Sequence, residues 1–132
     1  MAINKRNKNR AIVDDKEYLW WVFDEYDQTE FDGIQIKAVC SDQTHFFKYG
    51  LEQIEDNRSV VLALRDYTKL VHLTCPKFEN EDGIITKSGI TRLIKWCKNK
   101  KHQILYALDK KNNDLNAQEK QSLLKELQKI IN

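Results

Sequence analysis

Three cysteines and three histidines are the residues of this chain whose types could support nucleophilic chemistry. A catalytic thiol or hydroxyl needs an imidazole beside it and an acid or amide that orients the imidazole. His72 and Cys75 are close in sequence, but residues three apart on a strand point to opposite faces, so they make a poor dyad. His45 and His102 can reach a cysteine only through the fold. We therefore predict no catalytic residue and no enzyme.

The cysteines also bear on metal binding and on disulfides. Cys40, Cys75 and Cys97 are odd in number, widely spaced and without a Cys-x-x-Cys pair. Zinc sites and disulfide frameworks of secreted domains show closer and more regular spacing. Free cysteine packs as a small apolar side chain and is usually buried. We expect three reduced, buried thiols, and we predict no metal site and no cofactor.

Carboxylates are dense between residues 11 and 32, where Lys16 is the one basic residue. General acid or base catalysis needs a carboxylate whose pKa is shifted by burial or by a neighbour. A dense acidic segment usually stays solvated, so these carboxylates are poor candidates. The EF-hand spacing of calcium loops is not met. The four glycines never cluster into a GxGxxG or Walker loop, which argues against nucleotide enzymes.

The elements that must position these residues belong to one domain. A length of 132 residues, with 41% hydrophobic and 32% charged residues, is typical of a single globular unit. No run of about eighteen apolar residues occurs, and no apolar stretch follows the charged start. We therefore expect neither a membrane-spanning helix nor a secretory signal, and we predict a cytoplasmic protein.

Apolar alternation and β-forming residues predict five strands before residue 76. The first, YLWWVF, is the strongest core candidate, and the Asp-Gly dipeptide at Gly33 marks the turn that follows it. Pro76 ends the last strand because it lacks the amide hydrogen that a ladder needs. The predicted strands cover residues 18–23, 34–40, 45–49, 58–64 and 70–75.

After Asn80 the apolar period changes from two to 3.6, which predicts a helix over residues 88–98 with Thr86 or Ser88 as its N-cap. Residues 103–108 are most simply a last strand, and an extension of the helix is the alternative. Asn116 and Glu119 resemble a capping box that starts a C-terminal amphipathic helix. The apolar stripe of that helix contains Leu123, Leu124, Leu127, Ile130 and Ile131.

These elements predict an α+β fold in which an antiparallel meander of five or six strands is packed by one helix. Residues 1–10 form a basic flexible start, residues 11–108 the domain, and residues 109–132 a connector and the C-terminal helix. We expect that helix to fold back on the sheet, and a homodimer through it is the alternative. The expected core contains Trp20, Val22, Ile34, Ile36, Phe47, Val61, Leu73, Leu93 and Trp96.

Three stretches, CPKFE (75–79), IIT (84–86) and LIKWC (93–97), follow an aromatic strand YLWWV. Together they resemble a pattern of small uncharacterised bacterial proteins, over roughly residues 16–108. The resemblance implies a short meander that ends on a helix, and it implies no active site. Lys87 stands where that pattern has proline, and Phe78 where tryptophan is commoner.

The function that we predict is a non-catalytic protein-binding module. The acidic loop combines charges that steer a basic partner with aromatic anchors of the kind that carry interface energy. Immunity proteins and antitoxins block basic nucleases in this way, and the comparison is an analogy with that class of proteins. The predicted contact residues are Asp24, Glu25, Tyr26, Asp27, Glu30, Phe31 and Asp32.

Nucleic-acid binding is the alternative, although the net charge is only +2. A basic stripe could contact phosphates, and any exposed member of Trp20, Trp21, Phe46, Phe47 and Tyr49 could stack on unpaired bases. The stripe would join the basic start to the Lys-rich helix end. Its residues are Lys5, Arg6, Lys8, Arg10, Lys87, Arg92, Lys95, Lys98, Lys100 and Lys101.

Overall fold

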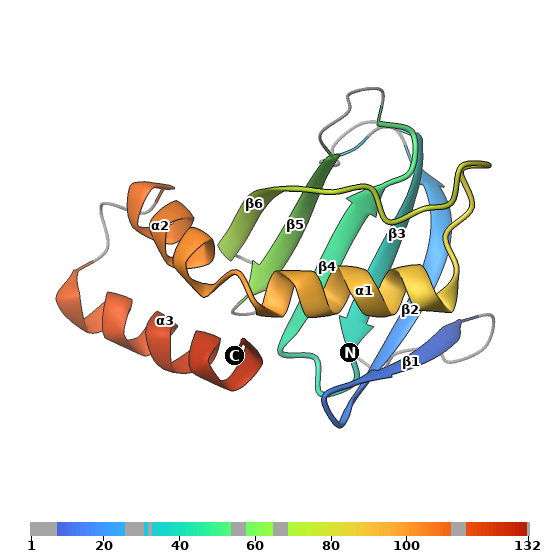
Figure 1. The fold of residues 1–132 in the computed structure, drawn as a ribbon. Helices are drawn as coiled ribbons and strands as arrows, with labels where there is room; N and C mark the ends of the chain where they lie inside the picture. The colour runs from blue at the N-terminus through green and yellow to red at the C-terminus, as the bar shows by residue number, and fades with distance from the viewer. Residues whose placement is uncertain are drawn as a thin grey trace.

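The computed structural model describes residues 8–25, 31, 33–53, 58–64, 69–111 and 116–131. Six strands form one antiparallel sheet in the order of the chain, and helices follow them (Figure 1). The α+β class and the meander are therefore confirmed. The elements are β1 (Asn9–Val13), β2 (Lys16–Glu25), β3 (Gly33–Cys40), β4 (His45–Gly50), β5 (Arg58–Leu64), β6 (Lys69–Cys75), α1 (Lys87–Lys98), α2 (Lys101–Lys111) and α3 (Ala117–Ile130).

The main core lies between one face of the sheet and the helices. Alternation along paired strands puts Tyr18 opposite Cys40, and Ala38 opposite Phe47, in rows that face α1. Figure 1 shows α1 crossing this face, which we call the inner face. A smaller cluster of Val39, Phe46 and Ala63 lies on the opposite, outer face.

The prediction of a frayed start to residue 10 is wrong for Asn9 and Arg10, which belong to β1. This strand pairs with β2 and buries Ala11 and Val13 on the inner face. Strand β1 has few apolar residues and follows a basic segment, so the alternation of apolar residues did not predict it. Asp14 and Asp15 form its turn to β2, with positive φ angles of 51° and 66°.

Two expected core residues are exposed: Val22 keeps 49% and Ile34 38% of its surface. Both lie near the end of the β2–β3 hairpin, where Ile34 pairs with the exposed Asp24. Alternation therefore indicated the correct face but not how far the helical cover extends. Trp96 is half-buried at the core edge. The other expected core residues are buried, namely Trp20, Ile36, Phe47, Val61, Leu73 and Leu93.

Helix α1 begins as predicted, with Thr86 as the N-cap whose side chain accepts from the Gly89 amide at 3.4 Å. Gly89 is needed for packing, because a Cβ there would lie 2.7 Å from the Phe78 carbonyl oxygen. The prediction of a strand over residues 103–108 is wrong, since they lie in α2. In a helix this short apolar run buries Ile104 against the main core, and this packing favours the helix over a strand.

Helix α3 begins at the predicted cap, where Asn116 accepts from the Glu119 amide at 2.8 Å. Its buried stripe joins the main core, so this helix folds back on the domain. Leu124 is the member of the predicted stripe that stays exposed. None of the described helices has the length and apolar character needed to cross a membrane. The buried stripe residues are Leu123, Leu127, Ile130 and Ile131.

Candidate functional site

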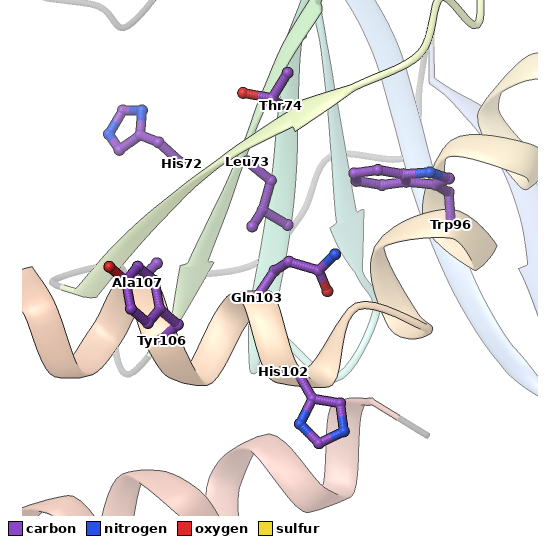
Figure 2. A pocket seen from close by; sticks show the side chains of 8 residues that line it. All are labelled: His72, Leu73, Thr74, Trp96, His102, Gln103, Tyr106 and Ala107. Atoms are coloured by element: carbon purple, nitrogen blue, oxygen red, sulfur yellow. The ribbon is translucent and has the colours of Figure 1, made fainter.

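A groove of about 1010 Å³ runs along the edge of the sheet between β6 and α2. Strand β6 supplies one wall and α2 the other, with Trp96 of α1 at one end (Figure 2). Its lining is mostly apolar. The lining residues are His72, Leu73, Thr74, Trp96, His102, Gln103, Tyr106 and Ala107.

Strand alternation and ring packing fix the shape of this groove, which we call the edge groove. Both Leu73 and His72 line the groove at this edge, but Leu73 points to the inner face and His72 to the outer face. The Trp96 ring packs edge-on against the buried Phe78 with ring centroids 6.2 Å apart, and the Lys100 amine lies 4.8 Å from the Trp96 centroid. The far end is open, because Tyr106 keeps 69% of its surface exposed.

The backbone of β6 adds a second property to this region. Within the described part of the chain β6 pairs with β5 alone, so it is an edge strand. An edge strand presents amide and carbonyl groups along its outer side that can pair with another extended segment. The edge groove therefore lies beside a backbone template for strand addition. Sequence reasoning missed it because residues 103–108 were interpreted as strand.

A second cluster lies at the β3–β4 hairpin. Cys40 ends β3, His45 begins β4, and Asp42 lies in the turn between them. The thiol sulfur, a carboxylate oxygen and an imidazole nitrogen lie within 4.8 Å of one another. The sequence signal for this cluster is the spacing Cys-x-Asp-x-x-His across a hairpin turn, which spacings between cysteine and histidine alone do not reveal. We call these three residues the hairpin cluster.

Hydrogen bonds orient the imidazole of this cluster. The Thr44 hydroxyl donates to Asp42 Oδ1 at 2.7 Å, so it must accept from His45 Nδ1–H at 2.8 Å. His45 Nε2 is then the acceptor for the Tyr18 hydroxyl at 2.7 Å. A continuous chain of donors therefore leads from buried Tyr18 to the exposed turn.

Burial sets the ionisation of these groups. It lowers the pKa of His45 to about 4 and raises the pKa of the Cys40 thiol and of Tyr18. Burial opposes ionisation of Asp42 as well, but hydrogen bonds from Thr44 and Cys40 and the charge of Lys16 hold its pKa well below the usual range. A protonated thiol beside a neutral, enclosed imidazole is a poor nucleophile.

A pocket of about 370 Å³ opens beside the hairpin cluster. Asp42 and Thr44 line one side of it, and the end of α3 lines the other. Lys16 spans the two sides, since its amine donates to Asp42 Oδ2 and to the Lys129 carbonyl oxygen, both at 3.4 Å. This pocket gives solvent a route to Asp42, while Cys40 and His45 stay buried.

The other two cysteines, Cys75 and Cys97, are also free and buried, so the prediction for the thiols is confirmed. Burial raises the pKa of Cys75 to about 12 and that of Cys97 well above its usual value. Both thiols line the main core, where they pack as apolar groups.

The predicted acidic contact loop is described only in part. Asp24 and Glu25 are exposed at the end of β2, whereas Tyr26, Asp27, Glu30 and Asp32 lie outside the described residues. Phe31 is half-buried, and its ring lies so close to Gly50 that a Cβ there would be 2.9 Å away. The buried Gln35 amide donates to the Phe31 carbonyl oxygen at 2.8 Å. Phe31 itself therefore packs on the domain beside Gly50.

Those residues of the predicted basic stripe that the structure describes do not share one surface. Lys8 lies 4.3 Å from the Trp21 centroid on the outer face, whereas α1 packs on the inner face. Lys98 is only 4% exposed, and its amine donates to Asp14 at 2.8 Å. Lys5 and Arg6 lie outside the described residues.

The remaining stripe residues are held in different ways. Arg10 pairs with Glu17 at 2.7 Å, and Arg92 donates to the Phe78 carbonyl oxygen at 3.3 Å. Lys87 and Lys95 are exposed on α1, and Lys101 is half-buried at the start of α2. Lys8 and the end of α1 therefore lie on two separate surfaces.

The outer face carries its own set of lysines and rings. The Lys37 amine lies 4.3 Å from the Phe46 centroid and 6.0 Å from that of Trp21. The Lys48 amine lies 5.7 Å from the Phe23 centroid. Strand alternation places these residues on one face, whereas Trp20, Phe47 and Tyr49 are buried in the main core.

Comparison of the chain with protein-family models, with curated proteins and with solved structures finds no match.

Proposed function

We propose that this chain is a non-catalytic protein-binding module that captures an extended segment of a partner at the edge groove. The observation that carries the proposal is a groove of about 1010 Å³ directly beside an edge strand. The partner's backbone would pair with β6, and an apolar side chain would enter between Leu73 and Tyr106. Main-chain pairing supplies affinity in this mode, and side-chain pockets supply specificity.

The rim of the edge groove favours an acidic partner segment. Lys100 and Lys101 lie at the junction between α1 and α2, at the Trp96 end. Positive charge at a rim speeds the encounter with a negative segment more than it raises the final affinity. Trp96 and Tyr106 are of the residue types that dominate interface energies. The expected ligand is therefore an extended acidic peptide with one large apolar residue.

This proposal keeps the predicted class of function, with immunity proteins and antitoxins as the analogy, and changes the contact surface. Asp24 and Glu25 remain candidates for a contact with a basic partner, but they line neither the edge groove nor the pocket beside Asp42. The edge groove offers concave apolar surface, which is where interface energy concentrates.

Selection of displayed random peptides on the immobilised chain tests the proposal. We expect enriched peptides that combine acidic residues with an aromatic or aliphatic anchor. Tyr106→Ser should weaken their binding about tenfold or more, because removal of an anchoring tyrosine costs more than 1.4 kcal/mol at such sites.

Ile12→Ser is the matched control. Ile12 keeps 57% of its surface exposed and lies on β1, the opposite edge of the sheet. Peptide affinity should be unchanged in this variant. Loss of binding with Ile12→Ser, or full binding with Tyr106→Ser, would overturn the assignment of the edge groove.

A second candidate function is single-stranded nucleic-acid binding on the outer face. The observation that favours it is the set of lysines over aromatic rings there, with Lys37 near the half-buried Trp21 and the buried Phe46. Lysines contact phosphates and rings stack on bases in such sites. Binding of an oligonucleotide that weakens steeply with salt and is reduced by Lys37→Ala, with Lys95→Ala as control, would support it. Absence of binding at low salt would exclude it.

A further inference from the structure

We propose that Cys40, Asp42 and His45 form a binding site for one zinc-type divalent ion. The three side chains offer one sulfur, one oxygen and one nitrogen atom, which is a mixed ligand set that zinc accepts. A tetrahedral zinc ion bound by three protein ligands keeps a fourth position for water. This site is independent of the edge groove and of the function proposed for it.

The hairpin supplies the geometry. Cys40 and His45 lie on neighbouring strands at the closed end of the β3–β4 hairpin, and both point to the inner face. Asp42 reaches them from the turn, so the three ligand atoms already lie within 4.8 Å of one another. Zinc–ligand bonds of about 2.0–2.3 Å need only a small further approach of the side chains.

Hydrogen bonds indicate which imidazole nitrogen would bind the ion. His45 Nε2 is held by Tyr18, which is fully buried, whereas Nδ1 is held by Thr44, an exposed residue of the turn. The ion would displace the Thr44 hydroxyl from Nδ1, and Nε2–H would then donate to the Tyr18 oxygen. Such a second hydrogen bond orients the imidazoles of most zinc sites.

The pocket beside Asp42 gives the ion a route of entry. On binding, the Cys40 thiol would lose its proton to solvent and the sulfur would bond to the ion as thiolate. Asp42 keeps acceptor capacity for the ion, since each carboxylate oxygen has two lone pairs. Lys16, at 3.4 Å from Asp42 Oδ2, and the more distant Lys98 are positive charges that oppose a cation there.

Titration of the full chain with Co²⁺, in the presence of a reductant that does not bind metals, tests the site. We expect one ion per chain, a thiolate-to-cobalt charge-transfer band, and displacement of that band by Zn²⁺. Cys40→Ala should abolish the band. Cys75→Ala removes a buried thiol elsewhere in the core and should leave the band unchanged.

Two variants at accessible positions separate coordination from folding, because Asp42 is exposed and Lys16 is half-buried, so neither removes a fully buried side chain. Asp42→Asn should lower the Zn²⁺ affinity at least about tenfold, whereas Lys16→Met should raise it. Thr44→Val should leave the affinity equal or higher, because the displaced hydroxyl is not a ligand. Circular dichroism would check that every variant keeps the native fold.

Saturation at one ion per chain, with affinity changes of opposite sign for Asp42→Asn and Lys16→Met, would support the proposal. This pair of variants decides the matter even if Cys40→Ala fails to fold. Absence of Zn²⁺ and Co²⁺ binding would overturn it, as would a charge-transfer band that survives Cys40→Ala in folded protein.

Discussion

The β3–β4 hairpin end and the edge groove each contain a histidine and a tyrosine, but these side chains are buried in the first region and exposed in the second. At the hairpin, Tyr18 and His45 are fully buried and each polar atom has a close partner. At the edge groove, His102 and Tyr106 are exposed on α2, above a mostly apolar floor. The same residue types thus serve the fold in one region and remain accessible in the other.

The difference shows why residue type alone does not identify a binding surface. A buried imidazole with two hydrogen bonds stabilises one arrangement of the hairpin, and its loss leaves partners unsatisfied. Accessible aromatic side chains beside an edge strand contribute little to folding and can contribute much to binding. Substitutions should therefore affect stability at the hairpin and binding at the groove.

The largest effect on stability is expected in the main core, on which both regions are built. Leu93 of α1 is fully buried in the main core, so Leu93→Ala should lower the free energy of unfolding by roughly 2–5 kcal/mol. Urea unfolding followed by circular dichroism measures this value. A change near zero would show that α1 does not pack on the sheet by this face.

Acid should destabilise the hairpin through His45. Burial lowers its pKa from 6.5 to about 4 in the folded protein, so the unfolded chain binds a proton first as the pH falls. The stability that neutral, buried His45 contributes to the folded protein is therefore fully present above pH 6.5. It is lost progressively as the pH falls from 6.5 to about 4. The loss over this window should be on the order of 3 kcal/mol, as measured by urea unfolding at several pH values.

Histidine variants assign that loss to one region. His45→Gln should remove the pH dependence over this window, whereas His102→Gln in the edge groove should keep it. If His102→Gln removed the dependence instead, the contrast between an enclosed hairpin and an accessible groove would be wrong.

A smaller effect is expected from the hydroxyl of Tyr18. Tyr18→Phe keeps the ring but leaves His45 Nε2 buried without its donor, which should cost about 1–3 kcal/mol of stability. Comparison of unfolding midpoints in urea gives the value. The matched change at the groove, Tyr106→Phe, removes an exposed hydroxyl and should cost much less; equal losses at the two positions would contradict the contrast.

The smallest effect on stability is expected at the groove itself. Tyr106 keeps 69% of its surface exposed, so Tyr106→Ser should change the free energy of unfolding by less than about 1 kcal/mol. Thermal unfolding followed by circular dichroism would measure it. A loss comparable with that of Leu93→Ala would show that this ring belongs to the core and not to a binding surface.

The fold was predictable from sequence wherever a pattern was long and local. Alternation in residues 34–40 predicted β3, the apolar run of β-forming residues at 58–64 predicted β5, and the period of 3.6 with a capping threonine predicted α1. Prediction from apolar patterns failed at β1, whose inward residues are only Ala11 and Val13. It also failed at α2, whose short apolar run fits either a period of two or a period of 3.6. Tertiary packing of Ile104 decides the second case.

The site was less predictable because it depends on contacts between elements. No local pattern shows that Trp96 and Tyr106, on different helices, line one groove with β6. The hairpin cluster is a partial exception, since a predicted turn between Cys40 and His45 already implies that the two residues face each other. Such a check needs the expected pairing of strands as well as the spacing of residues.

Amide hydrogen exchange at the two edges of the sheet tests the central claim most directly. The chain would be measured alone and saturated with a peptide selected on it. We predict slower exchange for β6 amides and unchanged exchange for β1 amides, because the peptide pairs with the β6 edge. Unchanged β6 exchange at saturation, with protection in β1 or around Asp24 and Glu25, would contradict the account.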